Sequence, residues 1–201
     1  MVFTTRAELA PISRRRLELP VEQEGYAFNP AIFRSGAGLT CIYRHVGVDG
    51  TRSLRRCALD GGFIAGEAAA WSDEAKALGG GVSWYADPRV FLYRGRWHVT
   101  FNTGHSEFPN NIYVAEVDES GRPVTAPRSI SKVDGRQGIE KNWGFFEHEG
   151  ELFCVYSISP FVILRVDGDG SARVYAKHRW HSEALEQAYG RLRGEIGRAH
   201  V

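Results

Sequence analysis

The chain has 201 residues, and its 25 lysine and arginine residues almost balance 24 aspartate and glutamate residues. Hydrophobic residues make up 43% and aromatic residues 12%, which is typical of a globular protein rather than a disordered one. The balanced charge argues against a nucleic-acid partner. No apolar run is long enough to cross a membrane and no secretory signal is visible, so we expect a cytoplasmic protein without a membrane partner.

The chain has three cysteines, at positions 41, 57 and 154. An odd number without Cys-x-x-Cys spacing argues against a disulfide framework and against a zinc site. All three stand in apolar, strand-like surroundings, where a thiol usually packs as a small hydrophobic group. No histidine and carboxylate cluster has metal-binding spacing either, so no metal is expected.

A pattern of strand, turn and second strand occurs three times along the chain. The copies read NPAIFRSGAGLTCIYR from Asn29, DPRVFLYRGRWHVTFN from Asp87 and NWGFFEHEGELFCVYS from Asn142. Their starting positions are almost evenly spaced along the sequence. Matching positions carry an aromatic residue in every copy, as at Phe33, Phe91 and Phe146. The chain therefore contains an internal repeat.

Further strand-like segments follow each copy, so that one unit has four antiparallel strands. A period in the fifties with four strands is typical of a β-propeller blade, and the alternatives are a β-sandwich or two short barrels. We predict an all-β fold, a partial β-propeller over residues 1–194 with about three four-stranded blades. The blades are expected near 28–80, 82–131 and 139–177, followed by a helical segment at 182–194.

The last residues of the chain have an unusual composition. The segment EIGRAHV, 195–201, interrupts the expected helix and reads like the translation of a sequencing adapter. We therefore expect a non-native tail at 195–201. Three blades do not close a ring, which agrees with an N-terminal fragment of a longer propeller.

The polar residues at the head of each repeat define a candidate site. First strands of all propeller blades begin on the same face, so their leading residues are expected to converge around the axis. Carboxyl, amide, cationic and aromatic groups together suit a carbohydrate ligand. The residues predicted to gather there are Tyr26, Asn29, Trp84, Asp87, Arg89, His105, Glu107, Glu140, Lys141, Asn142 and Trp143.

Asp87 is the candidate acid of this site. It heads a strand beside apolar neighbours, which would raise its pKa and keep the carboxyl group protonated. The alternative is a structural aspartate that caps the turn before Pro88. His105 is either a base or phosphate partner, or an incidental loop residue. Lys141 either faces the ligand or forms an exposed ion pair with Glu140.

The segments FNPAIF with IYR, DPRVFLYRGRWHVTF and EKNW resemble the five-bladed propeller enzymes of glycoside hydrolase family 130, the β-mannoside phosphorylases and hydrolases. The resemblance covers about residues 26 to 160. It implies that Asp87 is the proton donor, that Asn29 and Arg44 hold the glycone sugar, and that Lys141 lies near phosphate or substrate. Where the phosphorylases have a His-Arg pair, this chain reads YSISP, so a phosphate-binding set is not evident.

These features predict an enzyme that cleaves β-mannoside-like bonds by hydrolysis or phosphorolysis. The alternatives are a glycosyltransferase on the same scaffold and a sugar-binding propeller without catalysis. The expected partner is an oligosaccharide or a sugar phosphate. No cofactor is expected, apart from inorganic phosphate as the co-substrate of a phosphorylase. The oligomeric state is left open.

Overall fold

The computed structural model describes residues 17–21, 25–79, 82–158 and 160–178. Strands dominate this part of the chain, and its one α-helix is short. The prediction of an all-β protein is therefore confirmed. The elements are β1 (Gly25–Ser35), β2 (Gly38–Gly47), β3 (Arg52–Leu59), α1 (Trp71–Ala77), β4 (Ala86–Tyr93), β5 (Arg96–Asn102), β6 (Ile112–Val117), β7 (Arg128–Lys132), β8 (Gly144–His148), β9 (Glu151–Ile158), β10 (Phe161–Val166) and β11 (Ser171–His178).

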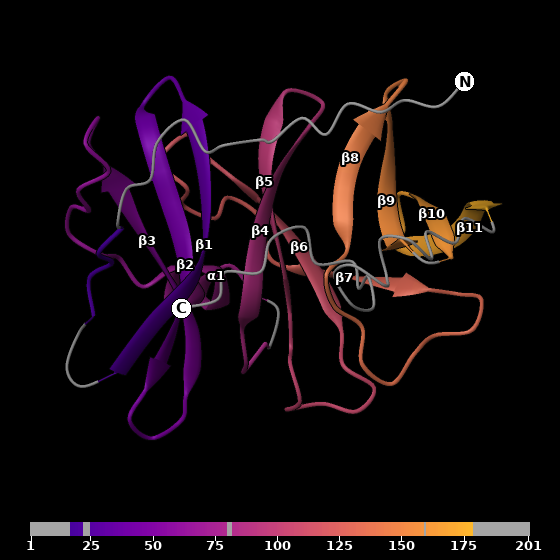
Figure 1. Cartoon of the computed structure of the whole chain (residues 1–201), viewed down its shortest axis with the longest axis horizontal. Helices are drawn as coiled ribbons and strands as arrows, with labels where there is room; N and C mark the ends of the chain where they lie inside the picture. Colours follow the sequence, from indigo (N-terminus) through magenta and orange to yellow (C-terminus); the bar gives the residue numbers. More distant parts are fainter. Residues whose placement is uncertain (1–16, 22–24, 80–81, 159, 179–201) are drawn as a thin grey trace, which may run out of the picture.

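The strands form three antiparallel groups in Figure 1, with β1–β3 on the left, β4–β6 in the middle and β8–β11 on the right. β7, which pairs with β6, lies below β8. β4 contacts both β1 and β8, so the first strands of the three groups lie together. β7 and β11 join the second and third groups through a short parallel pairing. This arrangement is that of propeller blades, as predicted.

The first blade differs from the expected pattern of four strands. It has three strands, and only isolated bridges at Ala65 and Ala69 continue the pairing beyond β3. The segment after β3 instead forms α1, whose Trp71 is fully buried against Tyr85 and Phe101. The glycine- and alanine-rich composition of this segment offers few of the β-branched side chains that a fourth strand would use.

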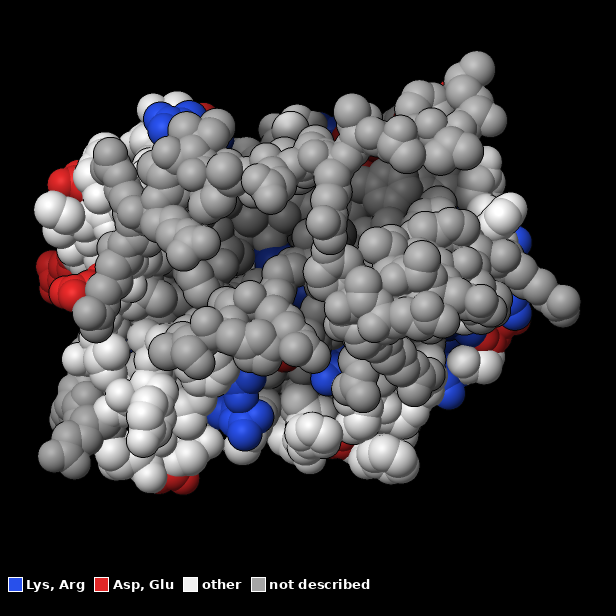
Figure 2. Space-filling view, viewed as in Figure 1, with Lys and Arg blue, Asp and Glu red and all other residues white. Residues whose placement is uncertain are grey.

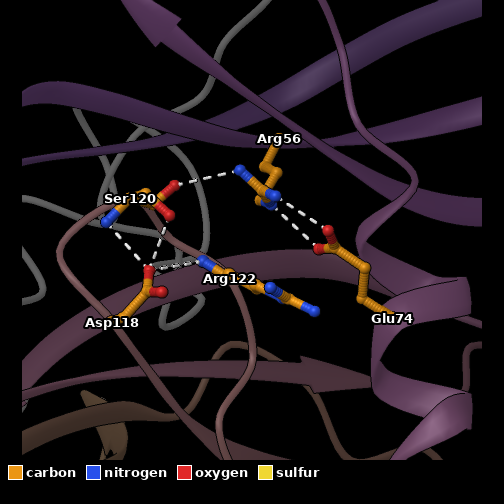
Figure 3. Close-up of polar contacts among 5 residues, drawn as sticks. All are labelled: Arg56, Glu74, Asp118, Ser120 and Arg122. Atoms are coloured by element: carbon orange, nitrogen blue, oxygen red, sulfur yellow. Dashed lines mark hydrogen bonds and ion pairs between the residues drawn. The ribbon is translucent and has the colours of Figure 1, made fainter.

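Polar contacts fasten α1 and the first blade to the second (Figure 3). Arg56 of β3 donates from Nε and Nη2 to the carboxylate of Glu74 in α1, at 2.8 and 2.7 Å. Its Nη1 also donates to the carbonyl oxygen of Ser120, in the turn between β6 and β7, at 3.4 Å. Asp118 holds this turn by accepting from the backbone N–H groups of Ser120 and Arg122. One arginine thus links three segments that are distant in the sequence.

The tight hairpins have turn residues that suit their backbone. Arg94 and Gly95 both have positive φ, 50° and 70°, and so do Glu149 and Gly150, 51° and 77°. Two successive left-handed residues form the turn whose twist matches the flanking strands. The turns YRGR and HEGE of the second and third repeat copies therefore lie at the ends of β4 and β8 that are away from the head residues.

Charged side chains form small groups on the surface. On the face shown in Figure 2, lysine and arginine side chains and acidic side chains form small spots, some of them adjacent, and no continuous area of one sign is visible among the described residues. All three cysteines are buried and free. No helix in the described ranges is long and apolar enough to span a bilayer. The predicted helix 182–194 and tail 195–201 lie outside the described residues.

The buried hydroxyl of Tyr85 predicts a loss of stability at alkaline pH. Burial raises the pKa of Tyr85 from its ordinary 10 to about 12. Because the folded state holds this proton more tightly, its contribution to stability is complete below pH 10 and is lost as pH rises toward 12. We expect the urea midpoint to fall over this range. In Tyr85→Phe the fall should be smaller; an identical fall would exclude Tyr85 as its source.

Candidate active site

The three head residues of the repeat share an uncommon backbone conformation. Asn29, Asp87 and Asn142 have φ values of 52°, 51° and 62°. Asparagine and aspartate adopt this left-handed conformation more readily than other residues with a side chain. The pairing of β1 with β2 and of β4 with β5 is interrupted at Asn29 and at Asp87. Such bulges redirect a side chain, and they set the polar head residues at corresponding places in the blades.

The carboxylate of Asp87 receives hydrogen bonds from three side chains. Oδ1 accepts from Asn29 Nδ2 at 2.6 Å and from Arg44 Nη1 at 3.0 Å. Oδ2 has a longer contact, 3.5 Å, with Asn102 Nδ2. The Asp87 side chain remains 30% exposed, so a ligand can reach it. The structure thus brings the heads of the first and second blades together at one carboxyl group.

The neighbours of Asp87 differ from those expected from the sequence. Apolar residues flank it in the chain, but its carboxyl group contacts two amides and a guanidinium group. The expectation of apolar surroundings is therefore wrong. The bulge at Asp87 is the physical reason, because it turns the side chain away from its apolar neighbours in β4 and toward the first blade.

Arg44 is a fixed cation beside this carboxylate. Its guanidinium carbon lies 4.7 Å from the centroid of the Phe28 ring, and the residue is buried. Burial lowers the pKa of Arg44, the Asp87 carboxylate raises it, and nearby Arg52 lowers it again. Arg44 stays charged at neutral pH since its ordinary pKa is far above neutrality.

A second contact joins the heads of the second and third blades. Arg89 of β4 donates from Nη2 to Oδ1 of Asn142 at 3.0 Å. Both side chains are partly exposed. β4 therefore connects the first blade through Asp87 with the third blade through Arg89, as its central position in Figure 1 suggests.

Glu140 and Trp143 lie inside the protein instead of facing a ligand. The Glu140 carboxylate accepts from the backbone N–H of Gln137 at 2.8 Å, from Trp143 Nε1 at 3.2 Å and from the Tyr156 hydroxyl at 3.3 Å. Glu140 and Trp143 are only 4% and 2% exposed. The backbone N–H and C=O of Glu140 also bond the Asn110 side chain. These residues therefore hold the loop before β8 in place.

Lys141 and His105 are exposed. Lys141 follows Glu140, whose carboxylate oxygens are bonded elsewhere, so the predicted ion pair between these neighbours is not formed. His105 lies in the loop between β5 and β6. Neither Lys141 nor His105 takes part in the hydrogen bonds to the Asp87 carboxylate, so their predicted roles toward a ligand stay predictions.

Asn102 is a site residue that the sequence reasoning did not select. It stands at the end of β5 and contacts Asp87 from its own blade. The repeat contains the signal that could have found it, because the offset that relates Asn29 to Asp87 also relates Arg44 to Asn102. Both Arg44 and Asn102 donate to the same carboxylate from equivalent places in neighbouring blades. In the third copy the equivalent position is Ser157, within YSISP.

Comparison with known proteins supports the fold. No family model and no curated protein matches the sequence. Among solved structures, a thermostable family-43 glycoside hydrolase is similar, with a TM-score of 0.56 and 14% identity over 75% of this chain and 54% of the other. An exo-1,5-α-L-arabinanase from a bovine ruminal metagenomic library gives 0.52 and 13% over 86% of this chain and 66% of the other.

These likenesses place the chain among the propellers that glycoside hydrolases use, as a matter of fold. The chain spans between about half and two thirds of the length of these structures. A structure reported for glycoside hydrolase family 130, described as mannoside phosphorylases and glycoside hydrolases, is also similar. Its TM-score is 0.49, with 14% identity over 75% of this chain and 51% of the other, and a likeness at this level does not assign the chain to that family.

The left-handed backbone at Asn142 predicts different effects of two small replacements. Both Asn142→Gly and Asn142→Ala lose the hydrogen bond to Arg89, but only glycine adopts φ of 62° without strain. We expect Asn142→Ala to be less stable than Asn142→Gly by about 1–2 kcal/mol in urea unfolding. Equal losses in both variants would show that the bond to Arg89, and not the backbone, sets the cost.

Proposed function

We propose that this chain forms part of an enzyme that cleaves glycosidic bonds, with Asp87 as its proton donor. The observation that carries the proposal is the uneven environment of the two Asp87 oxygens. Oδ1 is fixed by Asn29 and Arg44 at 2.6 and 3.0 Å, whereas Oδ2 has one contact at 3.5 Å. Oδ2 is therefore the oxygen that can carry a proton and present it to a substrate.

Proton donation to the leaving oxygen is the step that a glycosidase needs from such a carboxyl group. In the proposed mechanism, the glycosidic oxygen of the substrate takes the place of the weak contact to Asn102 at Oδ2. The firm bonds at Oδ1 keep the carboxyl group oriented while the proton moves. The leaving hydroxyl departs with that proton, and a water molecule forms the new bond to the anomeric carbon in its place. The Arg44 cation beside Oδ1 stabilises the carboxylate that forms, and the proton that the attacking water loses restores the acid through solvent.

The groups around Asp87 suit a sugar as the ligand. The amides of Asn29 and Asn102 offer donors and acceptors for hydroxyl groups. Elsewhere in the first two blades, Tyr26 of β1 and Phe108 of the loop between β5 and β6 are 73% and 83% exposed. Exposed aromatic faces beside polar groups are the features that receive the apolar face of a pyranose. The likeness in fold to family-43 enzymes agrees with this class of ligand.

We further propose β-mannosides as the first substrates to test, on the resemblance of FNPAIF, DPRVFLYRGRWHVTF and EKNW to family 130. Hydrolysis is favoured over phosphorolysis, because the position equivalent to Arg44 in the third blade is Ser157, which carries no charge for phosphate. Lys141, whose side chain is exposed, is a candidate for binding an anionic co-substrate.

The test is an assay of the chain with β-manno-oligosaccharides and, as a second panel, arabino-oligosaccharides, each with and without phosphate. Free sugar marks a hydrolase, and sugar 1-phosphate formed only with phosphate marks a phosphorylase. Chain elongation from an activated sugar donor would support a glycosyltransferase instead. Saturable binding without any turnover would overturn the enzymatic proposal in favour of a sugar-binding propeller.

A further inference from the structure

Phe108 is an aromatic side chain that the protein exposes to solvent. It lies in the loop between β5 and β6, residues 103–111, and is 83% exposed. The other phenylalanine side chains in the described ranges are buried or half-buried. An exposed ring contributes little to folding, because little of its apolar surface is removed from water. The stability of the fold therefore does not account for the placement of Phe108.

Hydrogen bonds hold the loop on both sides of Phe108. Before it, the Glu107 carboxylate accepts from Asn111 Nδ2 at 2.7 Å. After it, Arg136 Nη2 donates to the carbonyl oxygen of Asn110 and, at 2.7 Å, to Asn111 Oδ1. Asn110 is fully buried, and its side chain bonds the backbone of the loop before β8. The exposed ring thus stands on a well-held segment.

The tip of the Phe108 ring rests on the loop between β7 and β8, residues 133–143. A Cβ added at Gly138 of this loop would lie 2.5 Å from Cζ and 2.6 Å from Cε2 of the ring. The ring therefore touches Gly138, and a side chain at that position would displace it. Most of the ring surface is still open to solvent, so a flat ligand can stack on it.

Both loops lie on the face of the head residues. The first begins directly after Asn102, which contacts Asp87, and the second leads to the head residue of the third blade. Phe108 is three residues from Asn111, which is hydrogen-bonded across the base of its loop. Three residues of chain span at most about 11 Å. The ring is therefore within the reach of a short oligosaccharide bound at Asp87.

Polar groups of the same loop accompany the ring. Glu107, the preceding residue, makes its contacts through Oε2, and its Oε1 accepts no hydrogen bond among the described residues. His105 and Ser106 are exposed. A carboxylate oxygen accepts from hydroxyl groups, and an imidazole ring either donates or accepts. An aromatic face with such groups nearby is the combination that suits a sugar.

We propose that Phe108 and Glu107 form an outer sugar subsite, where the ring stacks on a pyranose that lies beyond the units bound at Asp87. The proposal rests on the proposed function of Asp87, and it narrows the substrate class to neutral oligosaccharides longer than a disaccharide. Short glycosides end before they reach the ring. The Glu107 carboxylate accepts from sugar hydroxyl groups and repels an acidic sugar.

The test compares methyl β-D-mannopyranoside with a β-linked mannotetraose by calorimetric titration of the whole chain. We expect the tetrasaccharide to bind about tenfold more tightly, and Phe108→Ala to remove most of this preference without changing the affinity for the monosaccharide. Phe108→Trp should keep the preference, because it restores a ring. The matched control Tyr175→Ala, which removes an exposed ring from β11, should keep it too.

A second variant moves the ring without removing it. The backbone at Gly138 is not left-handed, so Gly138→Ala adds no backbone strain, but its methyl group displaces the Phe108 ring. We expect severalfold weaker binding of the tetrasaccharide and unchanged binding of the monosaccharide. With Phe108→Ala in the same chain, Gly138→Ala should cost nothing further. Additive losses would contradict the contact as the cause.

Equal affinity of the wild-type chain for the two ligands, or no binding of the tetrasaccharide at millimolar concentration, would overturn the subsite. A loss in Phe108→Ala that is the same for both ligands would do so as well. If Phe108→Ala changes only the oligomeric state in analytical ultracentrifugation, Phe108 is a contact between copies of the chain and the subsite is wrong.

The binding readout separates this inference from the proposed function, because it requires no turnover. A length preference that depends on Phe108, in a chain that cleaves no glycoside, would support the subsite and contradict catalysis by Asp87. Cleavage of mannosides without any length preference in binding would do the reverse.

Discussion

Asp87→Asn is expected to lower the rate of glycoside cleavage by about 10²–10⁴-fold, the usual contribution of a general acid. The amide cannot donate an acidic proton from the position of Oδ2. The rest of the site should change little, because an asparagine oxygen still accepts from Asn29 and Arg44. Asparagine also tolerates the left-handed backbone at this position, where φ is 51°. The measurements are initial rates and a thermal unfolding curve.

The matched control is Asp118→Asn in the turn between β6 and β7. This aspartate accepts from the backbone N–H groups of Ser120 and Arg122 and takes no part in the candidate site. The same change of carboxylate to amide should leave the rate unaltered. If Asp87→Asn retains nearly the wild-type rate, the assignment of the proton donor is wrong. A thermal midpoint far below that of the control would mean that the rate loss reports unfolding.

The sequence predicted the blade architecture because three copies of one residue pattern can be seen in it. Matching aromatic residues at similar offsets require similar local structures, and similar blades pack through equivalent strands. The same logic placed Asn29 and Asp87 close together although they are distant in the sequence. What a repeat predicts well is therefore the position of a residue in its blade and the face on which it lies.

The direction of a side chain was harder to predict than its position. The bulge at Asp87 turns its carboxyl group toward the polar first blade, and no propensity of single residues reveals that turn. Glu140 illustrates the opposite case, since it stands close to a head residue in the chain but points into the protein. The decisive partners, Asn110 and Tyr156, come from other segments.

The helix α1 was missed for a different reason. The segment WSDEAKA has acidic residues in its first turn, a lysine in its last turn and Gly79 soon after its end, which are ordinary helix signals. It was overlooked since it lies where a fourth strand was expected.

Glu140→Ala is expected to destabilise the protein by about 3 kcal/mol or more, a large part of a typical stability. The truncation leaves the buried Trp143 Nε1 and the half-buried Tyr156 hydroxyl without their acceptor. It also removes the acceptor of the backbone N–H of Gln137, an exposed residue. Urea unfolding measures the loss. Lys141→Ala, at the next position, is the matched control, and because its side chain is exposed the free energy of unfolding should change by less than about 0.5 kcal/mol.

The conservative variant Glu140→Gln separates the charge from the shape. Burial raises the pKa of Tyr156, and the Glu140 carboxylate that it bonds raises it further. Removing the negative charge should therefore bring the alkaline titration of Tyr156 to lower pH in a chain that still folds. An unchanged titration, together with a stability loss no larger than that of Lys141→Ala, would contradict the structural role of Glu140. It would return this residue to the ligand-facing role that its place near Asn142 first indicated.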